Sequence, residues 1–327
     1  DGSAWTETGD LNTGRGQTAP ATQGTTTAFL LAGGSIGTAP TNANDETETF
    51  DGSSWTEVND LNTARRALTG GGTTTAAIAV GGQSAPNNFF GNTETFDGTD
   101  WTETADLNNV RNGASGCGTS TAALTFVGRI PPSAASTNKT ESWDGSSWTE
   151  VANTNTARNQ AAGLGIQTAA LLVAGSPQPA SQALTENFDG TSWTEVADLA
   201  TGRIGIGGSG TSSLGLVGGG EPGLTATEEW NFTSTLAAGA WASGGNLNTA
   251  RRLLHGDGTS TAAIVFGGNP ARDETETYDG SSWTEVADLT AGRHAVIGAG
   301  TQTAALCITG NPAPISANVE SWNGTSW

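Results

Sequence analysis

Lysine, tyrosine, histidine and cysteine are scarce in this sequence of 327 residues, and methionine is absent. Twelve Lys and Arg residues stand against 32 Asp and Glu, so the net charge is −20 at pH 7. Nucleic acids and anionic membrane surfaces attract basic residues, so we expect neither as a partner. No apolar run approaches the roughly 20 residues that cross a bilayer, which argues against membrane insertion. The first residue is Asp1 rather than methionine, and we expect a piece of a longer polypeptide.

The reactive residues are too few for most catalytic or metal sites. Cys117 and Cys307 cannot form a disulfide framework, and we expect two free thiols that fill apolar space. His255 and His294 are the only histidines, and two histidines without a third ligand make a poor metal site. We therefore predict a protein that is not an enzyme and that has no metal and no cofactor.

Tryptophan, in contrast, is frequent and regularly spaced. It recurs every 42 to 50 residues, at Trp5, Trp55, Trp101, Trp148, Trp193, Trp241, Trp283 and Trp327. An arginine follows each of the first seven by ten residues, at Arg15, Arg65, Arg111, Arg158, Arg203, Arg251 and Arg293. A glycine that closes an apolar run lies seventeen residues after six of these arginines and nineteen after Arg15. Such constant offsets identify a tandem repeat.

Each repeat predicts four short β-strands and no helix. In residues 65–110, a segment of small residues leads through a threonine turn to the apolar strand 76–80. Residues 93–96 then alternate polar and apolar, as a half-buried strand does. The dipeptide Asp97-Gly98 indicates a tight hairpin, and Trp101 begins the fourth strand. Four antiparallel strands in about 46 residues are typical of a propeller blade.

Seven repeats predict an all-β, seven-bladed β-propeller that forms a single domain over residues 1–327. The Gly and Ala residues after each arginine suit inner strands beside a narrow channel, where bulky side chains do not fit. Each fourth-strand tryptophan should bury about 150–250 Å² between neighbouring blades.

The two ends of the chain should meet in the last blade. The C-terminal segment supplies its first three strands, and residues 4–9 supply the fourth. Trp5 and Trp327 then compete for one position. Either Trp5 displaces Trp327, or the duplicated ends reach into neighbouring copies and build a homo-oligomer or filament.

Parts of the repeat resemble the kelch motif. They are the double glycines Gly81-Gly82 and Gly267-Gly268, the aromatic residues Phe50, Phe96 and Tyr278 before the turn, and the later tryptophan. The first glycine is replaced in three repeats, by Val127, Ala174 and Thr309. The repeat sequence, DGSSWTEV-DLNTAR-TAA-GG, is also similar to that of tandem arrays in structural proteins of marine tailed phages and environmental bacteria. The resemblance implies a propeller in an extracellular or virion setting.

The repeated arginines could bind an anion or pair with carboxylates, and the excess of acids favours pairing. The candidate partners are the Asp five residues earlier (Asp60, Asp106, Asp198, Asp288) and the third-strand glutamates (Glu48, Glu94, Glu141, Glu186, Glu276, Glu320). Because the third-strand glutamates alternate with Thr, we expect them on a solvated outer face that blocks edge pairing. We expect the same of the glutamates two residues after the tryptophans: Glu7, Glu57, Glu103, Glu150, Glu195 and Glu285. One repeat departs from the rest, with residues 231–239 in place of the Asp-Gly turn.

Loop length varies between the second and third strands, and we expect these loops on one face of the ring. Binding residues collect in loops that a rigid scaffold holds. The candidate binding residues there are Asn87, Asn88, Phe89, Phe90, Arg129, Lys139 and Arg272. Phe89 and Phe90 are expected to be exposed, as a sugar ring or a protein contact requires, unless the loop tips fold over the blade.

Together these features predict a structural or adhesive module, such as part of a phage fibre or surface appendage. Its partners would be a surface glycan or protein subunits of the same assembly. Two alternatives stay open: a carbohydrate-active enzyme that uses carboxylates near the central channel, and an intracellular kelch adaptor.

Overall fold

A computed structural model describes the chain except residues 1–4, 38–41, 87, 177–181, 222, 224, 233–239 and 311–317. Within the described residues there are 32 strands and no helix, and therefore no helix that could span a bilayer. Asn87, one of the candidate binding residues, lies outside the described residues.

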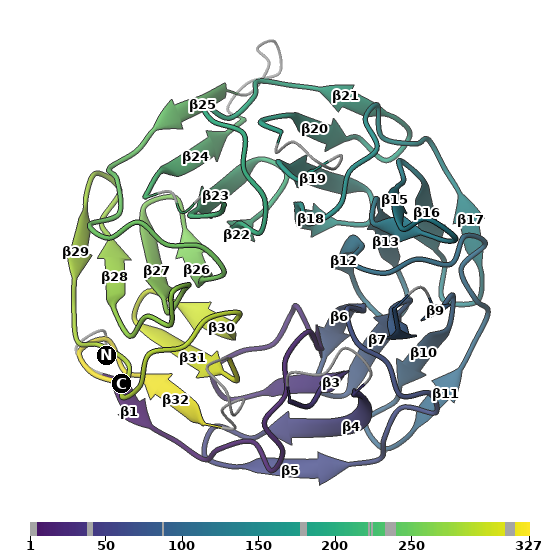
Figure 1. Cartoon of the computed structure of the whole chain (residues 1–327), viewed down its shortest axis with the longest axis horizontal. Coiled ribbons are helices and arrows are strands. Elements are labelled where there is room, and N and C mark those ends of the chain that lie inside the picture. The colour runs from purple at the N-terminus through teal and green to yellow at the C-terminus, as the bar shows by residue number, and fades with distance from the viewer. Residues whose placement is uncertain are drawn as a thin grey trace.

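Seven four-stranded antiparallel sheets form a ring around a central channel, which confirms the predicted seven-bladed β-propeller (Figure 1). Blades 1 and 2 contain β2 (Ala19–Pro20), β3 (Phe29–Ser35), β4 (Ala43–Phe50) and β5 (Trp55–Val58), then β6 (Thr69–Thr73), β7 (Ala76–Val80), β10 (Thr93–Phe96) and β11 (Trp101–Glu103). Blades 3 and 4 contain β12 (Ser115–Gly118), β13 (Ala123–Phe126), β16 (Thr140–Trp143) and β17 (Trp148–Glu150), then β18 (Ala162–Ile166), β19 (Ala169–Val173), β20 (Thr185–Phe188) and β21 (Trp193–Glu195).

Blades 5 and 6 contain β22 (Gly207–Gly210), β23 (Leu214–Gly218), β24 (Thr227–Asn231) and β25 (Ala240–Ser243), then β26 (His255–Thr259), β27 (Ala262–Phe266), β28 (Thr275–Tyr278) and β29 (Trp283–Glu285). Blade 7 contains β30 (Ile297–Thr301), β31 (Ala304–Ile308), β32 (Val319–Trp322) and β1 (Trp5–Glu7). In every blade the first strand lies nearest the channel and the fourth at the rim (Figure 1). We call the face with the connections from strand two to three and from four to one the loop face. The opposite face, with the turns between strands one and two and between three and four, is the hairpin face.

The last blade is closed by the two ends of the chain, as predicted. β1 pairs with β32 in antiparallel register, with Trp5 opposite Trp322. The Asp10 carboxylate also accepts the backbone N–H of Val319 at 2.8 Å, across 309 positions of sequence. The ring therefore has no unpaired outer edge at β32.

Both terminal tryptophan segments have a place in blade 7, so the expectation that Trp5 displaces Trp327 is wrong. In blade 2, Trp101 Nε1 donates to Thr47 Oγ1 of blade 1 at 2.9 Å. In blade 7, Trp327 Nε1 donates in the same way to Thr275 Oγ1 of blade 6, at 2.6 Å. β1 thus supplies the backbone of the fourth strand, while the side chain of Trp327 fills the seventh tryptophan position.

The glycines of the inner strands make room for the neighbouring blade as well as for the channel. A Cβ atom on Gly163 would lie 2.8 Å from the ring of Phe126, and one on Gly298 would lie 2.6 Å from the ring of Phe266. Each phenylalanine belongs to the preceding blade and is fully buried. The expectation that the channel alone excludes bulk was therefore incomplete, because contact between blades also demands small residues.

Candidate functional site

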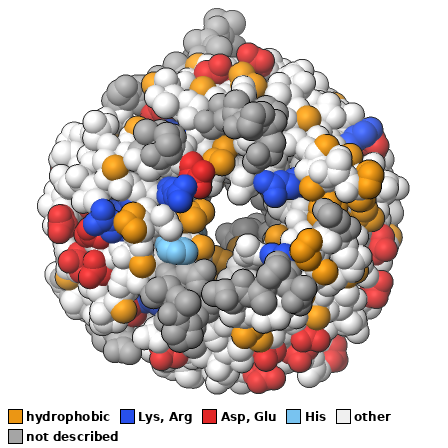
Figure 2. Space-filling model, in the orientation of Figure 1, with side chains coloured by type: hydrophobic (Ala, Val, Ile, Leu, Met, Phe, Trp, Pro, Cys, Tyr) orange, Lys and Arg blue, Asp and Glu red, His pale blue; other side chains and the backbone are white. Residues whose placement is uncertain are grey.

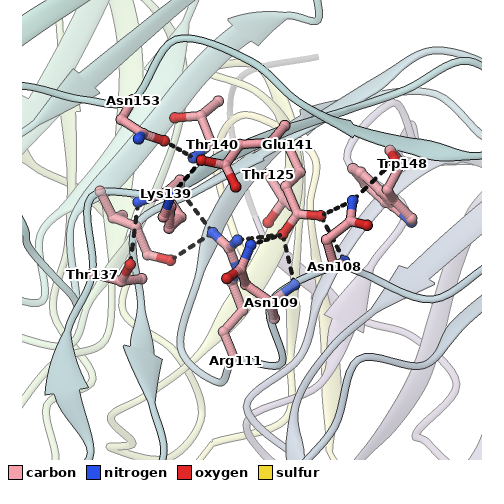
Figure 3. Close-up of polar contacts among 12 residues, drawn as sticks. Asn108, Asn109, Arg111, Thr125, Thr137, Lys139, Thr140, Glu141, Trp148 and Asn153 are labelled. Atoms are coloured by element: carbon pink, nitrogen blue, oxygen red, sulfur yellow. Dashed lines mark hydrogen bonds and ion pairs between the residues drawn. The ribbon is translucent and has the colours of Figure 1, made fainter.

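A buried arginine–glutamate pair lies beneath the loop face in each blade. In blade 3, Arg111 Nη2 lies 2.5 Å from Glu141 Oε1 (Figure 3). Glu141 Oε2 accepts the backbone N–H of Asn108 at 2.7 Å, and Arg111 Nη1 donates to the carbonyl of Lys139 at 2.7 Å. The pair therefore ties the connection that enters the blade to its third strand.

All seven blades repeat this geometry. The pairs are Arg15–Glu48, Arg65–Glu94, Arg111–Glu141, Arg158–Glu186, Arg203–Glu228, Arg251–Glu276 and Arg293–Glu320. In each, the second carboxylate oxygen accepts the backbone N–H of the residue three positions before the arginine. The guanidinium groups are buried and occupied, which leaves them unavailable to an external anion.

Two expectations about the acids need correction. The third-strand glutamates are buried, so they do not form a solvated face. The expectation is confirmed for five of the acids two residues after a tryptophan, which are exposed: Glu57, Glu103, Glu150, Glu195 and Glu285. Three of the four aspartates five residues before the arginines accept backbone N–H groups, as when Asp60 accepts the N–H of Thr47 at 3.2 Å.

Desolvation dominates the electrostatics of the pairs. Burial lowers the pKa of Arg65 and Arg111, and the attraction of Glu94 and Glu141 opposes it. Burial likewise raises the pKa of Glu48, against hydrogen bonds from Asn12. An arginine keeps its proton at neutral pH, so each pair is ionic. Removal of one partner would leave the other charge buried and unpaired, which strongly destabilises the fold.

A second ring of contacts holds the mouth of the channel on the loop face. One residue of each blade, two positions after the buried arginine, adopts a left-handed conformation with φ between 52° and 60°: Gln17, Ala67, Gly113, Gln160, Gly205, Leu253 and Ala295. Several of them hydrogen-bond from blade to blade, as when Ala67 N donates to Gln17 O and Gly113 N donates to Ala67 O, both at 2.9 Å. Five of the seven are not glycine, so the contacts must hold a backbone conformation that side chains disfavour.

All the remaining basic residues also lie on the loop face, in the connections between strands: Arg66, Arg129, Lys139, Arg252 and Arg272. Figure 2 shows this face, with basic side chains (blue) around the central opening. Arg252 pairs with Glu221 at 2.5 Å, Arg272 pairs with Glu274 at 2.9 Å, and Lys139 pairs with Glu150. Arg66 donates to Gln17 Oε1 at 2.8 Å.

The candidate binding residues lie on the loop face but do not form one site. Asn88 and Phe89 belong to an added hairpin of blade 2, which is formed by β8 (Gln83–Ala85) and β9 (Asn88–Phe89). Arg129 belongs to a similar hairpin of blade 3, which is formed by β14 (Arg129–Ile130) and β15 (Ala135–Ser136). Arg272 lies in blade 6, across the ring (Figure 1).

The two phenylalanines are less exposed than expected. Phe89 and Phe90 are half-buried, and Asn88 is exposed with Nδ2 at 2.6 Å from Ser84 Oγ. The backbone of Phe90 is fixed at both ends, because its N–H donates to Gly82 O at 2.8 Å and its carbonyl accepts the N–H of Arg111 at 3.1 Å. The loop is therefore anchored to the blade, with part of each ring accessible.

The central channel contains a polar pair that the sequence did not single out. A cavity of about 320 Å³ lies among the inner strands and is lined largely by glycine. His255 and Asp257 face it from β26, with Nε2 and Oδ2 3.1 Å apart. Their spacing of two residues on one strand was the signal, since such residues share a strand face. Thr22 and Gln23, which follow the first strand of blade 1, line the same cavity.

The two cysteines are buried, and the second histidine, His294, is partly buried. Cys117 and Cys307 are free and buried, and burial raises the pKa of each thiol to about 12. Burial also lowers the pKa of His294, with a smaller effect from Arg252. Among the residues that the structure describes, no three His, Cys, Asp or Glu side chains gather in a geometry that could hold a metal ion.

Fold and contacts together define a seven-bladed β-propeller with buried ion pairs beneath one face. The chain is similar in structure to the solved structure of YjhT, with a TM-score of 0.65. The match covers 85% of this chain and 99% of that one, at 13% sequence identity. No protein-family model and no curated protein matches the sequence. At this identity the likeness concerns the fold.

Proposed function

We propose that this propeller is a non-catalytic structural or adhesive module of an extracellular or virion assembly, such as a phage fibre. It binds a glycan or a neighbouring subunit through the loop face. The observation that carries this proposal is where the blades differ: blades 2 and 3 add the β8–β9 and β14–β15 hairpins on that face. Variation on one face of a constant scaffold is typical of recognition surfaces.

The chemistry of the added hairpins supports the same reading. Partly accessible Phe89 and Phe90 offer apolar ring faces next to the exposed amide of Asn88. Arg129, in the neighbouring hairpin, is half-exposed and makes no side-chain ion pair among the residues described. Aromatic faces beside amide and guanidinium donors suit a sugar ring or a protein surface. The resemblance of the repeat to kelch propellers and to phage arrays also supports this proposal.

A glycan array tests the proposal, with binding to a second copy of the chain measured by sedimentation. The double variant Asn88→Ala, Phe89→Ala should weaken binding about tenfold or more, since aromatic contacts dominate such interfaces. Asp144→Asn, on the hairpin face, is the matched control and should bind like the wild type. Equal binding by the double variant would place recognition elsewhere.

The channel supports a second candidate, a carbohydrate-active enzyme. His255 and Asp257 lie together in a cavity large enough for a small ligand. A hydrolysis assay on the same glycans decides between the two. Turnover that Asp257→Asn abolishes, with folding intact, would overturn the non-catalytic reading. An intracellular adaptor, the third candidate, would be recognised from the gene context of the full-length protein.

A further inference from the structure

Two arginines of the loop face are exceptions to the charge pairing of this protein. Acids outnumber bases 32 to 12, and ten of the twelve basic residues form an ion pair. Arg66 and Arg129 form none with any residue that the structure describes. In a chain of net charge −20, these two cations are therefore the ones that an external anion can reach.

Arg66 is the more unusual of the two, because its charge is buried. The residue is 9% exposed. Nη1 donates to the neutral amide oxygen of Gln17, at 2.8 Å, and Nε has no hydrogen-bond partner among the described residues. Burial lowers the pKa of Arg66, yet an arginine keeps its proton at neutral pH. A buried charge without a counter-ion is unfavourable, so a bound anion would offset a cost that the free protein carries.

Arg66 and Arg129 are the two ends of one arc of polar residues in blades 2 and 3. Arg66 and Gln83 exchange two backbone hydrogen bonds, both at 2.9 Å. Asn112 and Arg129 exchange two in the same way, at 3.1 and 2.9 Å. Residues paired like this project their side chains to the same side. Asn112 Nδ2 joins the two pairs by donating to Gln83 Oε1 at 2.6 Å. We call Arg66, Gln83, Asn112 and Arg129 the mouth arc.

The mouth arc lies where the channel opens on the loop face. Arg66 and Asn112 directly precede Ala67 and Gly113, whose backbones hydrogen-bond from blade to blade around the mouth. Basic side chains lie beside this opening (Figure 2). Between the two arginines, Asn112 Oδ1 is buried without a hydrogen-bond partner among the described residues. Guanidinium groups bind carboxylates through paired N–H donors, and an amide oxygen accepts from a hydroxyl group. The arc therefore suits a ligand that carries both carboxylate and hydroxyl groups.

A second copy of the chain does not present such groups to the arc. In a stack of loop face on hairpin face, the strand-one-to-two turns would lie nearest the channel, and they contain no charged residue. The aspartates of the hairpin face lie instead in the strand-three-to-four turns, towards the rim (Figure 1). A stack of loop face on loop face would bring two basic mouths together, which is unfavourable.

We infer that the mouth arc binds a carboxylated saccharide, such as a uronic acid of an acidic glycan. Arg66 and Arg129 hold its carboxylate groups, and Asn112 Oδ1 accepts one of its hydroxyl groups. This inference rests on the proposed function, because it names the class of glycan that the loop face takes. A neutral glycan lacks the group that the two arginines require.

Isothermal titration calorimetry with trigalacturonic acid and with its methyl ester tests the inference. The two ligands have the same hydroxyl groups, and only the first has free carboxylates. The acid should bind at least about tenfold more tightly than the ester. This difference should shrink as the NaCl concentration rises from about 50 to about 500 mM, because salt screens the attraction.

Three variants locate the binding on the mouth arc. Arg66→Gln and Arg129→Gln each remove one positive charge, and each should weaken binding of the acid about tenfold while leaving the ester unchanged. Arg129 is half-exposed, so Arg129→Gln should fold even if Arg66→Gln does not. Arg252→Gln is the matched control, because Arg252 has the position of Arg66 in blade 6 but pairs with Glu221. It should bind the acid within about twofold of the wild type.

Equal affinity for the acid and its ester would overturn the inference, and so would undiminished binding of the acid by both arc variants. Failure to bind the acid would also overturn it, whereas the proposed function would stand if the array showed other glycans that Asn88→Ala, Phe89→Ala loses. Acid binding that this double variant keeps and Arg129→Gln loses would support the mouth arc and contradict recognition by the β8–β9 hairpin. Self-association that Arg66→Gln abolishes would make the partner a second copy and contradict a saccharide.

Discussion

Blade 7 is assembled from the two ends of the chain, whereas blades 1 to 6 are each continuous, and yet the contacts at their borders match. Trp327 meets Phe266 of blade 6 edge-on with ring centroids 4.8 Å apart. Trp193 meets Phe126 of blade 3 in the same way at 5.1 Å. Chain continuity within a blade is therefore not required to reproduce the border between blades.

The comparison separates two roles that one segment performs in the other blades. In blade 2 a single segment gives both the fourth strand and its tryptophan, Trp101. In blade 7, β1 gives the strand and the C-terminal turn gives Trp327. The side-chain position and the strand position are thus filled independently, and each can be tested alone.

The largest expected effect concerns the buried ion pairs. Glu141→Ala leaves Arg111 charged and buried, and should lower the free energy of unfolding by about 3–5 kcal/mol. Glu320→Ala should do the same to Arg293 in blade 7. Urea unfolding followed by tryptophan fluorescence measures both. A much smaller loss for Glu320→Ala would show that the closing blade is held less tightly than the continuous ones.

Removing a border tryptophan should cost somewhat less. Trp101→Ala and Trp327→Ala each open a cavity between blades, and each should lower the free energy of unfolding by about 3 kcal/mol. Differential scanning calorimetry of the two variants provides the comparison. If Trp327→Ala melted like the wild type while Trp101→Ala did not, the seventh tryptophan position would be filled by another residue.

A single aspartate that bridges the chain ends should have a smaller effect. Asp10→Ala removes the acceptor of the Val319 N–H and should cost about 1–3 kcal/mol. Asp60→Ala, which frees the N–H of Thr47 in continuous blade 1, is the matched control. Thermal melting by circular dichroism measures both. No loss for Asp10→Ala beside a clear loss for Asp60→Ala would contradict the bridge.

The smallest effect should appear only at acid pH, in the turns of the hairpin face. Hydrogen bonds from the Ser146 hydroxyl and the backbone of Ser147 and Ser146 lower the pKa of Asp144 to about 2. The folded pKa is below the ordinary value, so the stabilisation is present above about pH 4 and is lost as pH falls towards about 2.

Blade 7 supplies the uncharged comparison for this turn. There Asn323 accepts the N–H groups of Thr325 and Ser326, at 3.0 and 3.1 Å. Asp144→Asn should therefore melt close to the wild type at pH 7 and lose less stability between about pH 4 and pH 2. Melting curves at both pH values measure the difference, and identical acid sensitivity would refute the role of Asp144.

The repeat made the architecture predictable from the sequence, because constant spacing fixes both the blade and its number. The same spacing also predicts that Trp327 occupies the seventh tryptophan position. Glu320 precedes Trp327 by seven residues, as Glu94 precedes Trp101. Glu228 was missed as a partner of Arg203, because the altered turn at 231–239 places Trp241 thirteen residues after it.

Burial and contacts across the ring were harder to predict. Alternation of Glu with Thr on the third strand suggested a solvated face, but the buried arginine of the preceding connection reverses that pattern. His255 and Asp257 looked ordinary in the sequence, and only the ring brings them to a cavity that is otherwise lined mainly by glycine. Such features depend on neighbouring strands, which sequence periodicity does not describe.

Hydrogen exchange of the third strands tests most directly whether the ring is closed by its own ends. β32 is paired with β31 on one side and β1 on the other, as β10 is with β7 and β11. Peptides covering 319–322 and 93–96 should therefore show the same slow exchange. Fast exchange of alternate amides in 319–322, with 93–96 protected, would show an open edge and contradict closure.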